Sequence, residues 1–324
     1  MAERVRIGII GSGGMGHAHA NAYSGDARAR IVAVADTDKA RARALGEKAG
    51  AKAYSDLARM LAKERLDAVS VCTPPAGHLQ ATLAALDAGC HVLCEKPMAL
   101  NAAQAERMVK RAAARRRLLI AAFCHRFHEP NLVAKRLIGE GRIGKVLQFR
   151  NRFAGMIPME GKWFSDPKVA GGGAIIDTSI HSIDLFRYLV GDAVSVSARL
   201  ATMIQPIKVE DSSMLLLQTA DGAIGSIEAC WSSPLSGAMI EIYGSQGTLI
   251  VDYETGLRYR TTAMKVWRRP KLTGPDRFTA QARHFLDCVL GERDPIVTGR
   301  DGWMAARIAD AAYASVKQKV WVAV

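Results

Sequence analysis

The chain has 324 residues, of which 49% are hydrophobic and 23% are charged, proportions typical of a globular protein and not of a disordered one. No apolar run reaches the roughly 18 uncharged residues of a membrane-spanning helix, so we expect no membrane-spanning segment. The net charge of +13 comes mostly from scattered arginines, with one dense run at residues 115–117 that is more typical of a solvated helix end than of a nucleic-acid surface.

The N-terminal residues enter a glycine turn and show no signal-peptide pattern, which favours a cytoplasmic protein. Six cysteines occur without a CxxC pair, and several lie inside apolar runs, so we expect buried free thiols in a reducing compartment. The length favours two domains. Because the arginines are scattered, we expect no nucleic-acid partner.

The first 120 residues alternate short apolar runs with longer amphipathic segments. Strands are predicted at Val5–Ile10, Ile31–Ala35, Ala68–Cys72, His91–Cys94 and Leu118–Phe123. Helices are predicted at His17–Ser24, Asp38–Ala49, Asp56–Lys63, His78–Ala88 and Asn101–Arg115. Strands separated by helices of this length form βαβ units, so we expect an α/β domain with a parallel sheet over residues 1–122.

The pattern changes after residue 122. Helices are predicted at Asn131–Gly139, Ala174–Val190, Thr279–Leu290 and Gly302–Lys319. Strands are predicted at Ser195–Thr202, Ser212–Thr219, Ile224–Trp231, Ala238–Tyr243 and Thr248–Tyr253. A block of strands with helices before and after it indicates an α+β domain over residues 123–324, built on an open antiparallel sheet.

The far face of this predicted sheet is expected to be apolar. Its expected residues are Val194, Val196, Leu215, Leu217, Ile240 and Ile242. Such a face needs a cover, so we expect a homodimer or homotetramer through the sheet.

A glycine-rich turn, GSGGMG, follows the first strand and opens the first helix. Gly11 permits the tight turn, Gly13 lets a pyrophosphate approach the backbone, and Gly16 lets the helix pack on the sheet. Asp36 ends the second strand, twenty residues after Gly16, where a carboxylate can accept hydrogen bonds from a ribose. It would repel a 2′-phosphate, so NAD is favoured over NADP, although Lys39 and Arg41 leave NADP open.

Two further strings complete a resemblance. Glu95-Lys96-Pro97 follows the strand His91–Cys94, and Gly171-Gly-Gly-Ala-Ile-Ile-Asp177-Thr-Ser-Ile-His181-Ser-Ile-Asp184 opens the long helix of the second domain. With the glycine turn, in this order, they resemble the glucose–fructose oxidoreductase, inositol dehydrogenase and rhizopine-catabolism (Gfo/Idh/MocA) family over nearly the whole chain. Ser179 departs mildly from the glycine of many members, and residues 124–126 lie where the family varies.

The resemblance implies a Rossmann domain followed by a substrate-binding domain. It also implies that Lys96, Asp177 and His181 perform catalysis, and physical reasoning supports those roles. Asp177 and His181 are four residues apart on one predicted helix, so the carboxylate can orient the imidazole for removing a hydroxyl proton. Lys96 follows a parallel strand, where ligands bind, and can stabilise the developing alkoxide.

Other residues are expected to contact ligands. The expected cofactor contacts are Gly11, Gly13, Gly14, Met15, Gly16, Asp36, Thr73, Pro74, His78, Glu95 and Lys96. The expected substrate contacts are Lys96, Arg126, Trp163, Asp177 and His181. Alternatives stay open: His78 could simply begin a helix, Arg126 could serve an ion pair, and Trp163 could be a core residue. The spacing of His17, His19, His125, His128 and His284 assigns them no role.

Asp184 could join Asp177 and His181 as a metal ligand, but no further cluster completes a site. We therefore expect no metal and expect Asp184 to hold a backbone group or an arginine.

The sequence thus predicts an NAD(P)-dependent oxidoreductase that interconverts a secondary alcohol and a ketone on a sugar, sugar derivative or cyclitol. Two alternatives are a glycosidase that uses transient oxidation by bound NAD and a non-catalytic NAD-sensing protein.

Overall fold

The computed structural model describes residues 4–324, which form two compact units. Of these residues, the first unit comprises residues 4–124 and Pro275–Ala306, and the second comprises His125–Gly274 and Arg307–Val324. The expected boundary at residues 122/123 lies two residues from the observed one. The structure differs in returning residues 275–306 to the first unit. Within residues 4–324, no helix is both long enough and apolar enough to cross a membrane.

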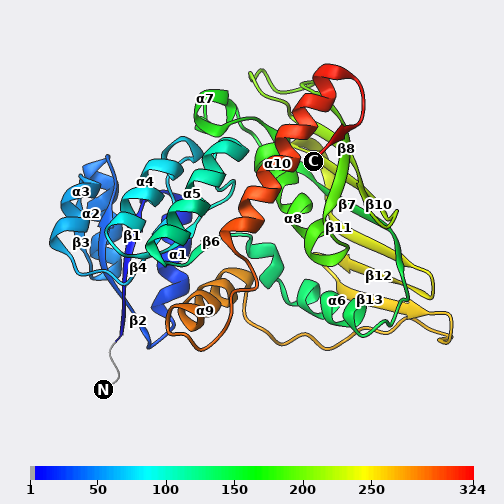
Figure 1. Ribbon diagram of the computed structural model, residues 1–324, viewed down its shortest axis with the longest axis horizontal. Coiled ribbons are helices and arrows are strands. Elements are labelled where there is room, and N and C mark those ends of the chain that lie inside the picture. Colours follow the sequence, from blue (N-terminus) through cyan, green and yellow to red (C-terminus); the bar gives the residue numbers. More distant parts are fainter. Residues whose placement is uncertain (1–3) are drawn as a thin grey trace. The chain divides into compact units, whose positions relative to one another are not determined.

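Six parallel strands form the sheet of the first unit (Figure 1). In spatial order they are β3 (Lys52–Tyr54), β2 (Ala29–Ala35), β1 (Val5–Ile10), β4 (Ala68–Val71), β5 (His91–Cys94) and β6 (Leu119–Ala121). This is the strand order of the Rossmann fold, and it confirms the predicted parallel sheet. The edge strand β3 was not predicted, because it has only three residues and begins with an exposed lysine.

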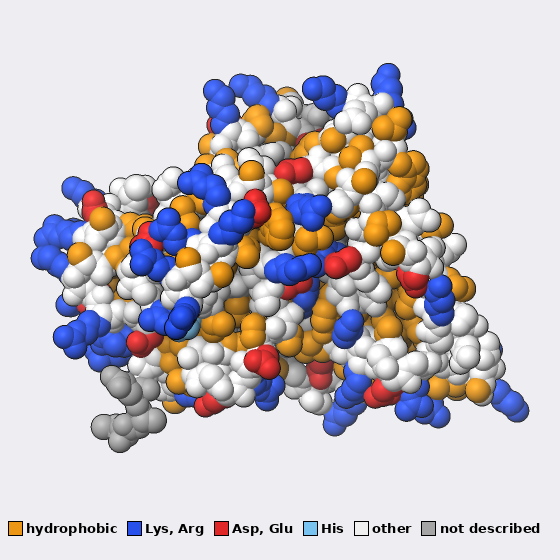
Figure 2. All heavy atoms as spheres, viewed as in Figure 1, with side chains coloured by type: hydrophobic (Ala, Val, Ile, Leu, Met, Phe, Trp, Pro, Cys, Tyr) orange, Lys and Arg blue, Asp and Glu red, His pale blue; other side chains and the backbone are white. Residues whose placement is uncertain are grey.

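The helices of this sheet lie close to their predicted positions. They are α1 (Gly14–Ser24), α2 (Lys39–Ala49), α3 (Leu57–Lys63), α4 (Pro75–Asp87) and α5 (Ala102–Arg115). Asp38, Asp56 and Asn101, each predicted as a first helical residue, are instead N-caps whose side-chain oxygens accept backbone N–H bonds. The arginines at 115–117 are exposed at the end of α5, as expected. On the face shown in Figure 2, lysines and arginines are spread among other side chains.

Residues 275–306 belong to the first unit because they pack on its helices and strands. Helix α9 (Arg277–Val289) packs against α1, and Arg28 bonds Asp287 of α9 at 2.7 Å. Helix α10 (Gly299–Gln318) begins so close to β6 that a Cβ on Gly299 would lie 2.9 Å from the Leu119 side chain. No such contact is visible in the sequence pattern, which shows only that α9 and α10 are helices.

Eight strands form the sheet of the second unit. In spatial order they are β13 (Gly256–Thr261), β12 (Gly247–Asp252), β11 (Ser232–Gly244), β7 (Val146–Met156), β10 (Ile224–Cys230), β9 (Ser212–Thr219), β8 (Ala193–Ala201) and β14 (Val322–Ala323). The prediction of an antiparallel sheet was incomplete, because β7 pairs in parallel with β10 and makes the sheet mixed. Strand β7 was missed because its arginines and polar side chains obscure its alternation.

Short helical segments and two longer helices complete the second unit. They are η1 (Cys124–Phe127), α6 (Glu129–Gly139), η2 (Trp163–Ser165), α7 (Pro167–Ala170), η3 (Ile175–Ser179) and α8 (Ile180–Leu189). Helix α8 covers part of one sheet face: a Cβ on Gly225 of β10 would lie 2.5 Å from the Phe186 ring. The end of α10 covers another part, where the Ala198 N–H donates to Ser315 Oγ at 3.1 Å.

The residues expected on the apolar outer face of this sheet lie mostly on its covered face instead. Five of the six expected residues are at most 1% exposed and belong to the core, leaving only Val194 at 44%. The opposite face presents other apolar side chains, namely Met214, Leu216 and Ile224, which are 45–59% exposed. Arg150 lies on this same open face, in ion pairs with Glu228 and Glu241. Alternation fixed which residues share a face, but not which face the helices cover.

Candidate active site

The glycine turn after β1 leaves open space where a phosphate would lie. Gly11 has φ +98°, and a Cβ there would meet the backbone of Cys72 at 2.6 Å. A Cβ on Gly16 would lie 2.1 Å from the Gly11 carbonyl oxygen, so close packing of α1 requires glycine. Around Gly13 and Gly14, by contrast, nothing lies within 4 Å of the added Cβ. The exposed backbone at the start of α1 therefore fits a dinucleotide pyrophosphate.

Asp36 is fixed beside this turn by backbone donors. Its Oδ2 accepts the Ser12 N–H at 2.7 Å and its Oδ1 accepts the Asp38 N–H at 2.9 Å. The carboxylate is half-buried, whereas Lys39 and Arg41 are exposed. Since a carboxylate oxygen accepts more than one hydrogen bond, Asp36 keeps acceptor capacity for ribose hydroxyls.

His78 joins two of the strand-end loops. It is 1% exposed, with Nδ1 2.8 Å from the Pro97 carbonyl oxygen and Nε2 2.7 Å from that of Thr73. Burial lowers the pKa of His78, although the two carbonyl groups oppose this effect. His78 thus connects the loop after β4 to the loop that contains Lys96, and its expected role as a cofactor contact stays a prediction. Thr73 is half-buried and Pro74 exposed.

Glu95 and Lys96 follow β5 but differ in burial. Glu95 is 5% exposed, and its carboxylate lies 2.8 Å from His19 Nε2 through Oε1 and accepts the Lys96 N–H at 3.1 Å through Oε2. Lys96 itself is half-buried. Both carboxylate oxygens of Glu95 thus have partners inside the first unit, and its expected contact with the cofactor stays a prediction.

The turn that carries Asp177 is a π-helical turn, η3, and not the predicted α-helix. Regular α-helix begins only at Ile180, so Asp177 and His181 lie on one continuous helical stretch whose first turn is wider. Residues four apart still lie near one face of such a stretch, and π-turns occur often at functional sites. Asp177 is half-buried and His181 is 9% exposed.

A buried carboxylate from a distant segment caps this turn. Glu210 Oε1 accepts the N–H groups of Gly173 and Ile175 at 3.1 and 3.0 Å, and the Tyr313 hydroxyl at 2.8 Å. Burial and the neighbouring Glu210 raise the pKa of Tyr313, which therefore stays protonated as a donor. A Cβ on Gly173 would lie 2.1 Å from the Glu210 carbonyl oxygen, which explains why the turn begins with glycine.

Asp177 is connected to the core of the second unit through Thr178. The Thr178 hydroxyl accepts the Trp231 indole N–H at 2.8 Å and donates to Asp177 Oδ2 at 3.3 Å. Trp231 is fully buried in a hydrophobic cluster with Met159 and Ala174. The carboxylate orientation therefore depends on an indole ring that cannot move freely. Ser179, the departure from the family glycine, is buried with its Oγ 3.0 Å from Ser213 Oγ.

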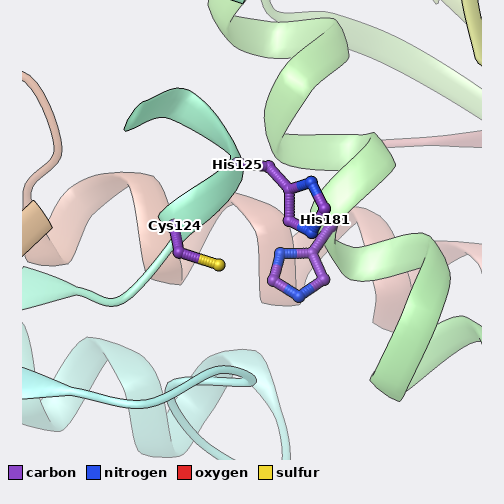
Figure 3. Close-up of side chains that lie close together, drawn as sticks. All are labelled: Cys124, His125 and His181. Carbon is purple, nitrogen blue, oxygen red and sulfur yellow. The ribbon is translucent and has the colours of Figure 1, made fainter. Parts of the chain in front are cut away.

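His125 lies against His181, a neighbour that the sequence did not reveal. Their ring centroids are 4.4 Å apart, and His125 Nδ1 is 2.7 Å from the Tyr253 hydroxyl. Figure 3 shows the two rings together with Cys124, which precedes His125 in the chain. One possible ligand atom from each of the three lies within 4.8 Å of the others, the only such group found in residues 4–324.

This group differs from the metal-ligand set considered from the sequence, which comprised Asp177, His181 and Asp184. Burial, with a smaller contribution from Glu95, raises the pKa of the Cys124 thiol to about 12. The thiol therefore carries its proton at neutral pH when no metal is bound, and it would have to lose this proton to act as a metal ligand. The expectation of no metal stays a prediction.

Asp184 holds an arginine, one of its two expected roles. Arg126 donates Nε to Oδ2 at 2.8 Å and Nη2 to Oδ1 at 2.6 Å, and both side chains are at most 5% exposed. Arg126 thus forms the ion pair considered as its alternative role, and its expected contact with the substrate stays a prediction. Trp163 is 39% exposed and stacks on Phe164 with ring centroids 3.6 Å apart, so it is not the core indole that was considered.

Comparison with known proteins agrees with this geometry. Residues 5–123 match the model of the Gfo/Idh/MocA oxidoreductase family with an NAD-binding Rossmann fold, and residues 132–250 match a Gfo/Idh/MocA C-terminal domain. The 1,5-anhydro-D-fructose reductase of Ensifer adhaerens is 30% identical over 80% of each chain. The chain belongs to the Gfo/Idh/MocA family.

Two further members of the Gfo/Idh/MocA family are similar over most of the chain. The myo-inositol 2-dehydrogenase of Thermotoga maritima is 28% identical over 84% of each chain. A solved levoglucosan dehydrogenase, in complex with NADH and levoglucosan, has 26% identity and a TM-score of 0.91 over 99% of this chain and 100% of its own. The protein is thus an oxidoreductase that acts on CH–OH groups and has an NAD-binding Rossmann domain.

Replacing Gly173 by alanine should destabilise the second unit. The added Cβ would collide with the Glu210 backbone, so we expect the free energy of unfolding to fall by about 2 kcal/mol or more in denaturant titrations. Gly139→Ala is the matched control, because nothing lies within 4 Å of its Cβ at the end of α6; it should leave stability unchanged or raise it by up to about 1 kcal/mol. Equal losses in both variants would contradict this explanation.

The His19–Glu95 contact should make stability depend on pH. Burial alone would lower the pKa of His19, but the contacts with Cys72 and Glu95 outweigh it and raise the pKa to about 10. A group with a raised folded-state pKa stabilises fully below its unfolded value of about 6.5 and loses this contribution as the pH rises towards 10. We expect the free energy of unfolding to decline between pH 7 and 10, and His19→Gln to flatten that decline. An unchanged slope in His19→Gln would count against the charged pair.

Proposed function

We propose that this protein oxidises a secondary alcohol on a sugar, sugar derivative or cyclitol to the ketone, or catalyses the reverse reaction, with NAD preferred over NADP. The observation that carries the proposal is that hydrogen bonds hold the two segments with the expected catalytic residues in fixed conformations. Inside the first unit, buried hydrogen bonds fix the loop of Lys96; inside the second, they fix the turn of Asp177 and His181. The relatives named above act on anhydrosugars and inositol, which supports this substrate class.

In the proposed mechanism, His181 removes the proton of the substrate hydroxyl. Asp177, held by Thr178, orients the imidazole and stabilises its protonated form. The Lys96 ammonium donates a hydrogen bond to the same oxygen and stabilises the negative charge that develops on it. When bound, NAD supplies the acceptor for the hydride that leaves the carbon.

Residues near the glycine turn also support the cofactor preference. Asp36 would accept ribose hydroxyls, and its negative charge would oppose a 2′-phosphate. Arg41 is paired with Asp38 at 3.3 Å, which reduces its availability for such a phosphate. The turn at Gly13 and Gly14 would hold the pyrophosphate through backbone N–H groups.

The test is absorbance at 340 nm with NAD or NADP and a panel of sugars, sugar acids, anhydrosugars and inositols. We expect NADH formation with at least one polyol, and a drop in kcat of about a hundredfold or more in Lys96→Ala and in His181→Ala, since both act on the transferred proton or its charge. Lys110→Ala, which removes an exposed lysine of α5 that pairs with Glu106 at 2.8 Å, is the control and should retain wild-type kcat. Release of an aglycone without net NADH, or near-wild-type kcat in both catalytic variants, would contradict the proposal.

We further propose that the open face of the second sheet forms a homo-oligomer interface. The exposed side chains of Met214, Leu216 and Ile224 on this face support the proposal. We expect light scattering at micromolar concentration to give at least a dimer mass, and Leu216→Glu to lower it. Leu290→Glu, at an equally exposed leucine of the first unit, should leave the mass unchanged. A monomeric wild-type protein would contradict the interface.

A further inference from the structure

The first unit contains a buried acid–base pair that the mechanism above does not use. His19 of α1 is 3% exposed and Glu95 is 5% exposed, and His19 Nε2 lies 2.8 Å from Glu95 Oε1. Neither residue is near the other in sequence, being 76 positions apart. A pair so deeply buried costs desolvation free energy, and an apolar pair of similar volume would often be at least as stable. A stabilising role alone is therefore a weak explanation for it.

Every polar atom of this pair has a defined partner. His19 Nδ1 is 3.0 Å from Ser70 Oγ, which is in turn 2.9 Å from the Tyr23 hydroxyl. On the other side, Glu95 Oε2 accepts the backbone N–H of Lys96 at 3.1 Å. The pair therefore connects α1 and β4 to the peptide that leads into Lys96, and both carboxylate oxygens are used.

The hydrogen bonds on either side of the Glu95–Lys96 peptide show what this connection fixes. The Glu95 N–H already donates to the Val71 carbonyl at 2.9 Å in the sheet, so β5 is fixed up to Glu95. The next peptide lies beyond the strand, where sheet pairing no longer orients it. The hydrogen bond from the Lys96 N–H to the Glu95 carboxylate supplies that orientation, and His19 prevents the carboxylate from turning away.

We propose that His19 and Glu95 are positioning residues for Lys96, which set the direction in which its backbone leaves β5 and thereby the location of its ammonium group. The proposal rests on the proposed function insofar as Lys96 acts in catalysis. Neither residue touches the substrate in this proposal. Both act through the Lys96 peptide, and an error of about 1 Å in a catalytic group can lower a rate about a hundredfold.

The first experiment compares Glu95→Gln and His19→Gln with Tyr23→Phe, which removes the hydroxyl at the far end of the same network. We expect kcat to fall about ten- to hundredfold in both glutamine variants, with KM and the NAD dissociation constant within about threefold of wild type. Tyr23→Phe should retain kcat within about twofold. If the glutamine variants keep wild-type kcat, or if they lose NAD binding and kcat in parallel, the positioning role is overturned.

The double variant His19→Leu with Glu95→Leu separates positioning from stability. Replacing both partners by apolar side chains removes the buried charges together, so the thermal midpoint should recover towards the wild-type value relative to either glutamine variant. We expect kcat to remain low in the double variant, because the Lys96 N–H has lost its acceptor. A double variant with wild-type kcat would overturn the proposal.

A readout without turnover distinguishes this proposal from the proposed function. Reductive methylation with ¹³C-formaldehyde labels lysines, and the Lys96 resonance is identified by its loss in Lys96→Arg. We expect this resonance to shift or broaden in Glu95→Gln and to stay unchanged in Tyr23→Phe. An unchanged resonance in Glu95→Gln overturns the positioning role even if the enzyme is active. A shifted resonance in a protein that oxidises no polyol supports the positioning role and counts against the proposed function alone.

Discussion

A carboxylate buried in a protein needs hydrogen-bond donors or a cation. This requirement determines the backbone contacts of the two segments that carry the expected catalytic residues, the loop of Lys96 and the turn of Asp177 and His181. Glu95, Asp184 and Glu210 are each at most 8% exposed. Each is satisfied differently: Glu95 by an imidazole and a backbone N–H, Asp184 by a bidentate guanidinium, and Glu210 by two backbone N–H groups and a phenol. In two of the three cases the donors are backbone groups of the segment that carries an expected catalytic residue.

The buried acids hold the backbone in the interior of each unit, whereas the expected reactive side chains lie closer to the surface. Lys96 and Asp177 are half-buried, whereas the acids that bond the backbone at Lys96 and just before Asp177 are almost completely buried. Functional groups that must meet a ligand gain precision when the shell behind them is locked by packing and hydrogen bonds. Trp231 acts in a similar way, because its indole is enclosed in the core and its N–H orients the Thr178 hydroxyl.

The sequence predicted the first unit well because its elements are local. The glycine turn, Asp36 and the end of β5 lie at fixed places in βαβ units, and alternating strands and helices of this length already indicate a parallel sheet. The second unit was predicted less completely. Glu210 caps a turn more than thirty residues earlier in the chain, and His125 contacts His181 from a segment more than fifty residues away, so no spacing pattern reports either contact. The sheet face was misassigned because alternation shows which residues share a face but does not show which of the two faces is covered.

The discontinuity of the first unit has a consequence for biosynthesis. Its sheet strands are all translated by residue 121, yet α9, which packs on α1, begins only at residue 277. Domains tend to fold as they emerge from the ribosome. The surface of α1 that binds α9 therefore stays exposed until most of the remaining polypeptide has been synthesised. The second unit is likewise incomplete until residues 307–324 arrive. A premature stop codon before residue 275 would therefore leave neither unit whole, and the truncated product would present apolar surface to chaperones and proteases.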